Sequence, residues 1–368
     1  MRRILIYLFE LIMMFAVFVV CDMPGTIKYA VVALLSILFL LLGRKKKWSA
    51  ESLICVSLPM IVYLMIGGFT SLINASAYSF TVKIFLFWLI PFLFAFSLYV
   101  YYGKDMLRIV DMQFWGCCII YAVSNIRFII ENGFAESVFA FVFGMYIIYY
   151  AYRKCWSKLT IAMVLMYCSE KRIAMLAVLA ARMVMMILWL FRNHKKLALI
   201  IWGTVTVFVL FYIWAICSGT LAYFCQGIGI NTNGRIKMYT SIVEWFGNSA
   251  IVLGNGLGIV EKLLEYWILV GFNNLPNDLL KFYLEIGIVG LSLYLLSYGT
   301  AIKLIGNKFG NKTMSLFLVI GIYTIALFAT DNVSIYIIYV FPMYSIYFAV
   351  LSAKKQEEIT QVYDKKNI

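Results

Sequence analysis

The stretch PNDLLKFYLEIGIVG, residues 276–290, begins an apolar segment and closes a region that starts at Cys217. That region is the only long part of the chain that does not read as a series of membrane spans. It contains Gly234-Arg235 and the glycine-rich run Leu253–Gly258. Elsewhere, apolar segments of about membrane length alternate with short connections. We therefore expect residues 217–278, with the span ends that face them, to form the working surface of a membrane protein.

The composition excludes a soluble domain. The 368 residues are 64% hydrophobic and 13% charged, with a mean hydropathy of +0.93, whereas about a quarter of the residues of a soluble domain are charged. The net charge of +14 would suggest nucleic acid in a soluble protein. In a membrane protein, Lys and Arg instead mark cytoplasmic loops, and we expect no nucleic-acid partner. The scattered cysteines, without a CxxC pair, predict neither a metal nor a cofactor.

The hydropathy pattern predicts an all-α polytopic membrane protein with about twelve transmembrane helices. The first is expected to be retained, because no small-residue cleavage site follows it. The expected spans are Ile4–Val20, Thr26–Gly43, Ser52–Ile73, Thr81–Tyr102, Met112–Ile126, Ser137–Tyr152, Leu159–Cys168, Ile173–Phe191, Leu197–Cys217, Leu279–Gly299, Met314–Thr330 and Ile335–Leu351. They divide the chain into a bundle (1–216), a large loop (217–278), three C-terminal spans (279–352) and a tail (353–368).

Basic residues give the predicted orientation. With both termini in the cytoplasm, the inner connections hold more than twice as many Lys and Arg as the outer ones, as the positive-inside rule requires. The short seventh span is needed, because deleting it would put Arg192, Lys195 and Lys196 outside. Residues 217–278 then form a large external loop.

The external loop is expected to contain two interfacial helices. Tyr239, Ile242, Val243 and Phe246 share one helical face, and the segment 259–268 repeats the pattern with charges opposite. Between them, Gly254, Gly256 and Gly258 predict a bend at which the backbone approaches another part of the molecule closely. The glycines are weak evidence for a phosphate site, because no strand precedes them.

Charged residues inside predicted spans are costly and by default mark function. Arg182 lies about 15 Å of helix below Arg172 and needs either a carboxylate from a neighbouring helix or a ligand phosphate. Asp278, Lys281 and Glu285 share one helical face. Lys281 and Glu285 can pair locally, and Asp278 can be an N-cap or a functional acid.

A sparse set of cations is also predicted on the outer face. Arginine suits bidentate phosphate recognition, so an anionic lipid-linked substrate would explain the set, although ion pairs with Glu131, Glu136, Glu170 and Glu244 compete as an explanation. The set comprises Arg127, Lys171, Arg172, Arg235, Lys237 and Lys281.

Several of these motifs, in this order, resemble the superfamily of O-antigen ligases and repeat-unit polymerases, including the Wzy-type polymerases of capsule and O-antigen. The resemblance covers the second half of the chain. It is carried by Ser169-x-x-Arg172, Gly234-Arg235, Leu253–Gly258, Pro276-Asn277-Asp278, Leu280-Lys281, Glu285–Leu291 and Asp331-Asn332-Val333-Ser334. Ligases carry a His just before the Asn of the junction between the external loop and the next span. This chain has Pro276 at that position, before Asn277, so the resemblance favours a polymerase.

The resemblance implies a GT-C-like glycosyltransferase of the bacterial cytoplasmic membrane. We expect it to be metal-independent, because the sequence contains no metal-ligand cluster. It would join oligosaccharide repeat units carried on a polyprenyl diphosphate, with a chain-length regulator and a flippase as expected partners. Arg172 and Arg235 would stabilise the leaving diphosphate, and Asp278 would be the base, with Glu285 second. Expected substrate-binding residues are Lys171, Arg182, Lys237, Gly256, Asn277, Lys281, Glu285 and Arg127. The alternatives are a flippase or other transporter, a ligase-type transferase, and a structural subunit without chemistry.

Overall fold

The computed structural model describes residues 25–43, 48–74, 78–132, 136–192, 194–229, 232, 234–247, 251–267 and 275–366. Within these ranges the chain is all-helical, as predicted, and contains no strand. In chain order the elements are α2 (Gly25–Gly43), α3 (Ala50–Ile73), α4 (Tyr78–Tyr102), η1 (Gly103–Asp105), α5 (Met106–Asn132), α6 (Phe139–Arg153), α7 (Trp156–Cys168), α8 (Arg172–Leu190), α9 (Lys195–Cys217), α10 (Thr220–Ile228), α11 (Arg235–Trp245), α12 (Ile259–Trp267), α13 (Asp278–Lys308), α14 (Asn311–Phe328), η3 (Val333–Ile335) and α15 (Ile337–Lys366).

Seven helical segments of the described chain are long and apolar enough to cross a membrane, consistent with a polytopic α-helical membrane protein. One of them, Tyr78–Asn125, joins α4 to α5; α2 and α7 are apolar but shorter. A helix covers each predicted span from the second to the twelfth, while the first, Ile4–Val20, lies outside the described residues. The count of about twelve spans and their orientation stay predictions.

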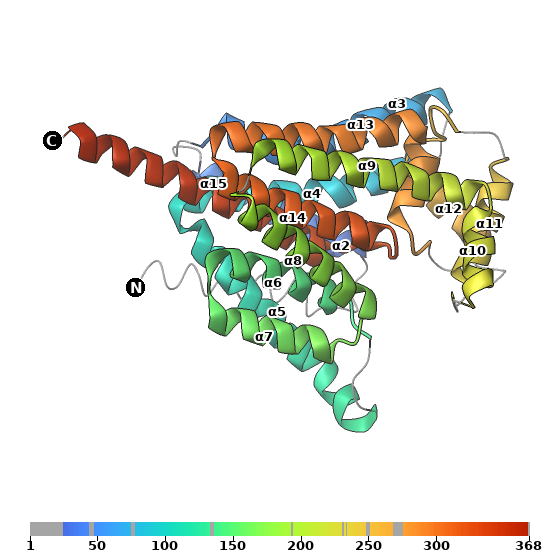
Figure 1. Ribbon diagram of the computed structural model, residues 1–368, viewed down its shortest axis with the longest axis horizontal. Helices are drawn as coiled ribbons and strands as arrows, with labels where there is room; N and C mark the ends of the chain where they lie inside the picture. Colours follow the sequence, from blue (N-terminus) through green and yellow to red (C-terminus); the bar gives the residue numbers. More distant parts are fainter. Residues whose placement is uncertain are drawn as a thin grey trace.

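The long helices lie roughly along one direction, with α10, α11 and α12 gathered at one end of the bundle and the C-terminus at the other (Figure 1). We call the first the loop end. The bundle has an inner and an outer layer. Between 72% and 83% of the apolar segment of α13, α14 and α15 is buried inside the protein, against 28% for α8 and α9. Because α14 and α15 have the largest buried shares, they form the centre of the bundle.

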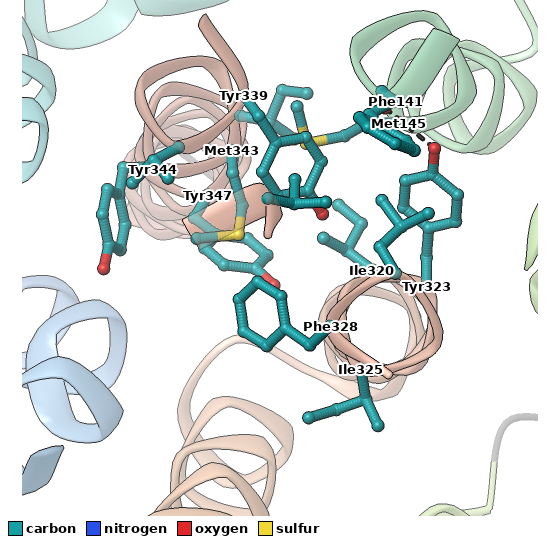
Figure 2. Close-up of a cluster of buried hydrophobic side chains, with 14 of the residues drawn as sticks. Phe141, Met145, Ile320, Tyr323, Ile325, Phe328, Tyr339, Met343, Tyr344 and Tyr347 are labelled. Carbon is teal, nitrogen blue, oxygen red and sulfur yellow. Dashed lines mark hydrogen bonds between the residues drawn. The ribbon is translucent and has the colours of Figure 1, made fainter. Parts of the chain in front are cut away.

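The core between α6, α14 and α15 is rich in aromatic residues (Figure 2). The Tyr323 hydroxyl reaches from α14 to α6 and donates to the carbonyl oxygen of Phe141 at 2.8 Å. Phe317 and Tyr347 stack with their ring centroids 4.0 Å apart. Phe139–Tyr150 of α6 is buried at every position. The hydrogen bond holds α6 against α14, and the stacked rings hold α14 against α15.

Helix α13 is broken at Gly287, whose φ of 71° and ψ of 178° are not helical. The loop 251–258 lies against the break and supplies the hydrogen bonds that a continuous helix would have made. Gly256 N–H donates to the Glu285 carbonyl at 2.9 Å, and Ile288 N–H donates to the Ile251 carbonyl at 2.9 Å. The freed backbone groups are thus satisfied, as buried groups must be.

The predicted close approach of the glycine-rich bend is confirmed. A Cβ on Gly254, which has a φ of 81°, would lie 2.3 Å from the Glu285 carbonyl oxygen, and one on Gly258 would lie 2.6 Å from Phe80 Cβ. Both predicted loop helices are also present, as α11 and α12. The bend binds the backbone of α13 and thereby fixes the start of α12 at the loop end.

Candidate functional site

Two helices begin at the same cavity at the loop end, and each has arginine as its first residue. Helix α8 starts at Arg172 after the N-cap Lys171, and α11 starts at Arg235 after the N-cap Gly234; neither helix has a side-chain cap. A cation at a helix N-terminus opposes the helix dipole, so helix stability does not explain these arginines. N–H groups without a side-chain cap, next to guanidinium groups, are suited to binding an anion.

The cavity between them has a volume of about 870 Å³. Its walls come from α7, α8, α9, α10 and α11 and from the segments that join α5 to α6 and α14 to η3. It is lined by Glu136, Tyr167, Glu170, Lys171, Arg172, Ile173, Met175, Tyr212, Leu221, Thr232, Arg235, Ile236, Tyr239, Ala329, Thr330 and Asp331. We call it cavity 1.

The three cations of cavity 1 are held differently. Lys171 forms an ion pair with Asp331, with 2.8 Å between Nζ and Oδ2, and lies 4.8 Å from the centroid of the Phe141 ring. Arg235 Nη1 donates to the Thr330 carbonyl at 2.7 Å, which orients the guanidinium without neutralising it. Arg172 is exposed. Among the described side chains no carboxylate lies within 4.0 Å of either arginine, so both positive charges are available to a ligand.

Two tyrosines that line cavity 1 tie its helices to neighbouring segments. The Tyr239 hydroxyl donates to the Pro276 carbonyl at 2.9 Å, and Tyr212 donates to the Ala329 carbonyl at 2.8 Å. Burial raises the pKa of Tyr239 to about 12, partly opposed by the charge of Arg235. Tyr239 is therefore neutral at physiological pH and serves as a hydrogen-bond donor that ties α11 to the start of α13.

Cavity 1 also contains two exposed carboxylates that we did not predict as site residues, Glu136 and Glu170. The competing explanation of the cations, ion pairs with Glu136, Glu170 and Glu244, is not supported within the described part of the chain, since no such pair is formed there; Glu131 lies outside the described side chains. Glu170 has a φ of 46°, a sparsely populated conformation that recurs at functional sites. Its position beside Lys171 and Arg172 was the available signal.

The interpretation of Asp278 as the N-cap is wrong, and its side chain is not exposed at the protein surface; its role as a base stays a prediction. Asp278 is fully buried, and its carboxylate accepts hydrogen bonds from Ser334 N–H at 2.7 Å and Ser334 Oγ at 2.6 Å. Asn277 is the N-cap, accepting from Leu280 N–H at 2.9 Å. Both acceptor oxygens of Asp278 are thus used to hold η3 against α13.

The predicted local pair of Lys281 with Glu285 is also wrong. Lys281 forms its ion pair with Glu261 of α12. Glu285 accepts instead from the Tyr63 hydroxyl and from Gly258 N–H. The single charged face of α13 therefore contacts three separate segments, η3, α12 and α3 with the bend. These contacts hold the segments in place around α13. Lys281 and Glu285 lie outside cavity 1.

The remaining predicted site residues do not line cavity 1 either. Arg182 has the sulfur of Met185, at 3.6 Å, as its polar partner, and no carboxylate of the described chain pairs with it. Lys237 is exposed on α11. Asn277 donates to the Tyr212 hydroxyl at 2.9 Å, and Gly256 binds the backbone of α13. The side chain of Arg127 lies outside the described ones.

A smaller cavity, cavity 2, lies on the other side of the turn that follows α14. It has a volume of about 250 Å³. Asp331 lines cavity 1, while the next residue, Asn332, lines cavity 2. Cavity 2 is lined by Phe80, Lys83, Phe87, Val260, Glu261, Leu264, Glu265, Leu275, Asp278, Lys281, Asn332 and Ile335.

No protein-family model matches the chain, and no curated protein matches it. Among the described residues, no group of three or more His, Cys, Asp or Glu side chains could hold a metal ion. The chemical groups available in cavity 1 are therefore guanidinium, ammonium, carboxylate and phenol groups and the two helix N-termini.

Proposed function

We propose that the protein is a polysaccharide polymerase that joins oligosaccharide repeat units carried on a polyprenyl diphosphate, at the outer face of a bacterial cytoplasmic membrane. Cavity 1 would hold the diphosphate. A chain-length regulator and a flippase are the expected partners, and capsule, exopolysaccharide or O-antigen the expected product. The sequence resemblance supplies the reaction class, and cavity 1 supplies a site suited to it.

One observation carries the proposal: Arg172 and Arg235 stand at the uncapped N-termini of two different helices and face one cavity. Helix N–H groups and guanidinium forks are the protein groups that best complement phosphate oxygens. Their position at the end of an apolar bundle suits a ligand whose tail lies in the bilayer and whose diphosphate lies at the surface. Confinement of both lipid substrates to the membrane would supply proximity.

In the proposed reaction the bond between the anomeric carbon of the donor and the diphosphate oxygen breaks, and the diphosphate leaves with the electron pair. Arg172 and Arg235 would stabilise the charge that develops on it. The new bond forms between the anomeric carbon and a hydroxyl oxygen of the acceptor. Glu170 or Glu136 would take the hydroxyl proton, because both are exposed in cavity 1, whereas the carboxylate of Asp278 is occupied by Ser334.

The second candidate is a transporter, such as a flippase for lipid-linked oligosaccharides. The observation that favours it is the broken helix α13, which carries the buried charges of Lys281 and Glu285. Discontinuous helices with charged groups are typical of transporter substrate sites. In this protein, however, the break is filled by the bend 251–258, and the two arginines without a carboxylate partner, Arg172 and Arg235, line cavity 1 instead.

The test uses cells that depend on this protein for surface glycan, with Arg172→Ala, Arg235→Ala and, as matched control, Lys237→Ala. Lys237 is an exposed cation on α11 outside cavity 1. We expect each arginine variant, at normal membrane levels, to lose polymer while single repeat units are still transferred, and Lys237→Ala to make full polymer. Depletion of lipid-linked units from the outer leaflet would indicate the flippase instead. Full polymer from both arginine variants would refute both functions.

A further inference from the structure

Cavity 2 and cavity 1 share one segment of the chain, the turn from Asp331 to Ile335. Asp331 lines cavity 1, whereas Asn332 and Ile335 line cavity 2. The turn is fixed to the start of α13 by the Asp278–Ser334 hydrogen bonds and by Asp278 N–H donating to the Asp331 carbonyl at 3.3 Å.

The charges of cavity 2 differ from those of cavity 1. Its floor is the ion pair of buried Lys281 with Glu261, and its mouth carries two exposed groups of opposite charge, Lys83 and Glu265. With Asp278, the lining carboxylates outnumber the ammonium groups. This balance disfavours a phosphate and favours a ligand that is neutral and donates hydrogen bonds.

One acceptor in cavity 2 has no donor. Glu261 Oε1 contacts Lys281, whereas Oε2 is buried and has no hydrogen-bond partner among the described groups. A buried carboxylate oxygen without a donor is costly, so this side of cavity 2 favours a ligand that donates hydrogen bonds over an anion. Lys83 and Glu265 at the mouth offer a further donor and a further acceptor for hydroxyl groups.

The walls and the size narrow the choice further. Phe80 and Phe87 line cavity 2. The Phe87 ring stacks on Tyr29 with 4.6 Å between centroids, so Phe80 is the main apolar surface for a ring. The volume of about 250 Å³ is below the range of roughly 300–1,000 Å³ that holds a drug-sized ligand, so it suits one sugar ring and is too small for an oligosaccharide. A ring that carries several hydroxyl groups meets all of these conditions.

We infer that cavity 2 binds one sugar residue of the acceptor. This inference rests on the proposed function and adds a second subsite to it. Another sugar of the same acceptor presents its hydroxyl in cavity 1, next to Glu136 and Glu170. The acceptor oxygen there forms the new bond to the donor carbon, its proton goes to the carboxylate, and the diphosphate departs. Lys83 and Glu265 are thus specificity-determining residues.

The test measures sugar binding to the full-length protein in lipid nanodiscs by saturation-transfer NMR. The probes are glucose, galactose and N-acetylglucosamine, with inorganic diphosphate and phosphoethanolamine as competitors. The Lys83→Ala/Glu265→Gln variant changes only exposed side chains, so it should fold; Glu244→Gln on α11 is the matched control. We expect saturation of at least one sugar, a loss of at least threefold in Lys83→Ala/Glu265→Gln, and full signal in Glu244→Gln and in Arg172→Ala/Arg235→Ala.

Three results would overturn the inference. They are the absence of saturation for every sugar, a sugar signal that the Lys83→Ala/Glu265→Gln variant retains, and a signal displaced by phosphoethanolamine, which would make cavity 2 a lipid headgroup site. Displacement by inorganic diphosphate together with loss in the arginine variants would put the sugar in cavity 1 and also overturn it. If the proposed function alone fails, the arginine variants keep making polymer while sugar binding at cavity 2 is unchanged.

Discussion

The contact between the glycine-rich bend and broken α13 predicts a large effect of Gly254→Ala. The new Cβ would lie 2.3 Å from the Glu285 carbonyl oxygen and 2.5 Å from Gly287 N. Both atoms belong to the backbone, so neither can rotate away. The bend would have to move from α13, breaking hydrogen bonds such as that of Gly256 N–H with the Glu285 carbonyl.

The size of the effect has two parts. An alanine at a φ of 81° costs about 1–2 kcal/mol because of its left-handed conformation. Overpacking against a fixed neighbour adds about 1–3 kcal/mol. The sum is roughly 2–5 kcal/mol, a large fraction of the roughly 5–15 kcal/mol by which proteins are stable.

A matched control separates the two parts. Gly219 has a φ of 74°, but nothing lies within 4 Å of the position of its Cβ, so Gly219→Ala carries only the conformational cost. Thermal unfolding of both variants in the same detergent, followed by intrinsic fluorescence, should give a clearly lower midpoint for Gly254→Ala than for Gly219→Ala. Equal midpoints would refute the inference that the bend is clamped against the break in α13.

Three further predictions concern the charged residues. Asp278→Asn should lower stability by about 1–3 kcal/mol, because one donor from Ser334 loses its acceptor, yet leave the polymer made per folded molecule unchanged; loss of polymer at normal stability would restore Asp278 as the base. Lys281→Met should cost about 3 kcal/mol by leaving Glu261 unpaired, and Lys281→Met/Glu261→Leu should recover most of it in the same unfolding assay; no recovery would mean that the pair is not the cause. Arg182→Leu should leave the unfolding midpoint and the surface glycan unchanged or raise the midpoint, since the described chain offers this guanidinium no carboxylate; a loss of polymer would show a ligand contact.

The helices could be predicted from the sequence because each is a run of apolar residues bounded by polar ones. The close backbone approach at the glycine-rich bend could be predicted, since glycine at alternate positions indicates one. Its partner could not be predicted. The break at Gly287 interrupts a run that reads as one continuous helix, and only the packed loop makes its non-helical conformation favourable.

The candidate site was predictable in part. The positive-inside pattern assigned Arg172 and Arg235 to one predicted face of the membrane, and the structure brings both to cavity 1. The pattern carries no information on the lateral arrangement of helices, so the exposed Glu170 and Glu136 in the same cavity were missed as site residues. For Asp278, Lys281 and Glu285, helical periodicity gave the shared face correctly, but the partners Ser334, Glu261 and Tyr63 are distant in sequence.

The most direct test of the central claim is the affinity of the purified protein, in nanodiscs, for a polyprenyl diphosphate. Each charged hydrogen bond contributes about 1.5–3 kcal/mol, and tenfold in affinity corresponds to about 1.4 kcal/mol. We therefore predict that Arg172→Ala and Arg235→Ala each weaken binding by roughly 10- to 100-fold, while Lys237→Ala binds like the unmodified protein. Equal affinity in all of them would contradict the claim that cavity 1 holds the diphosphate.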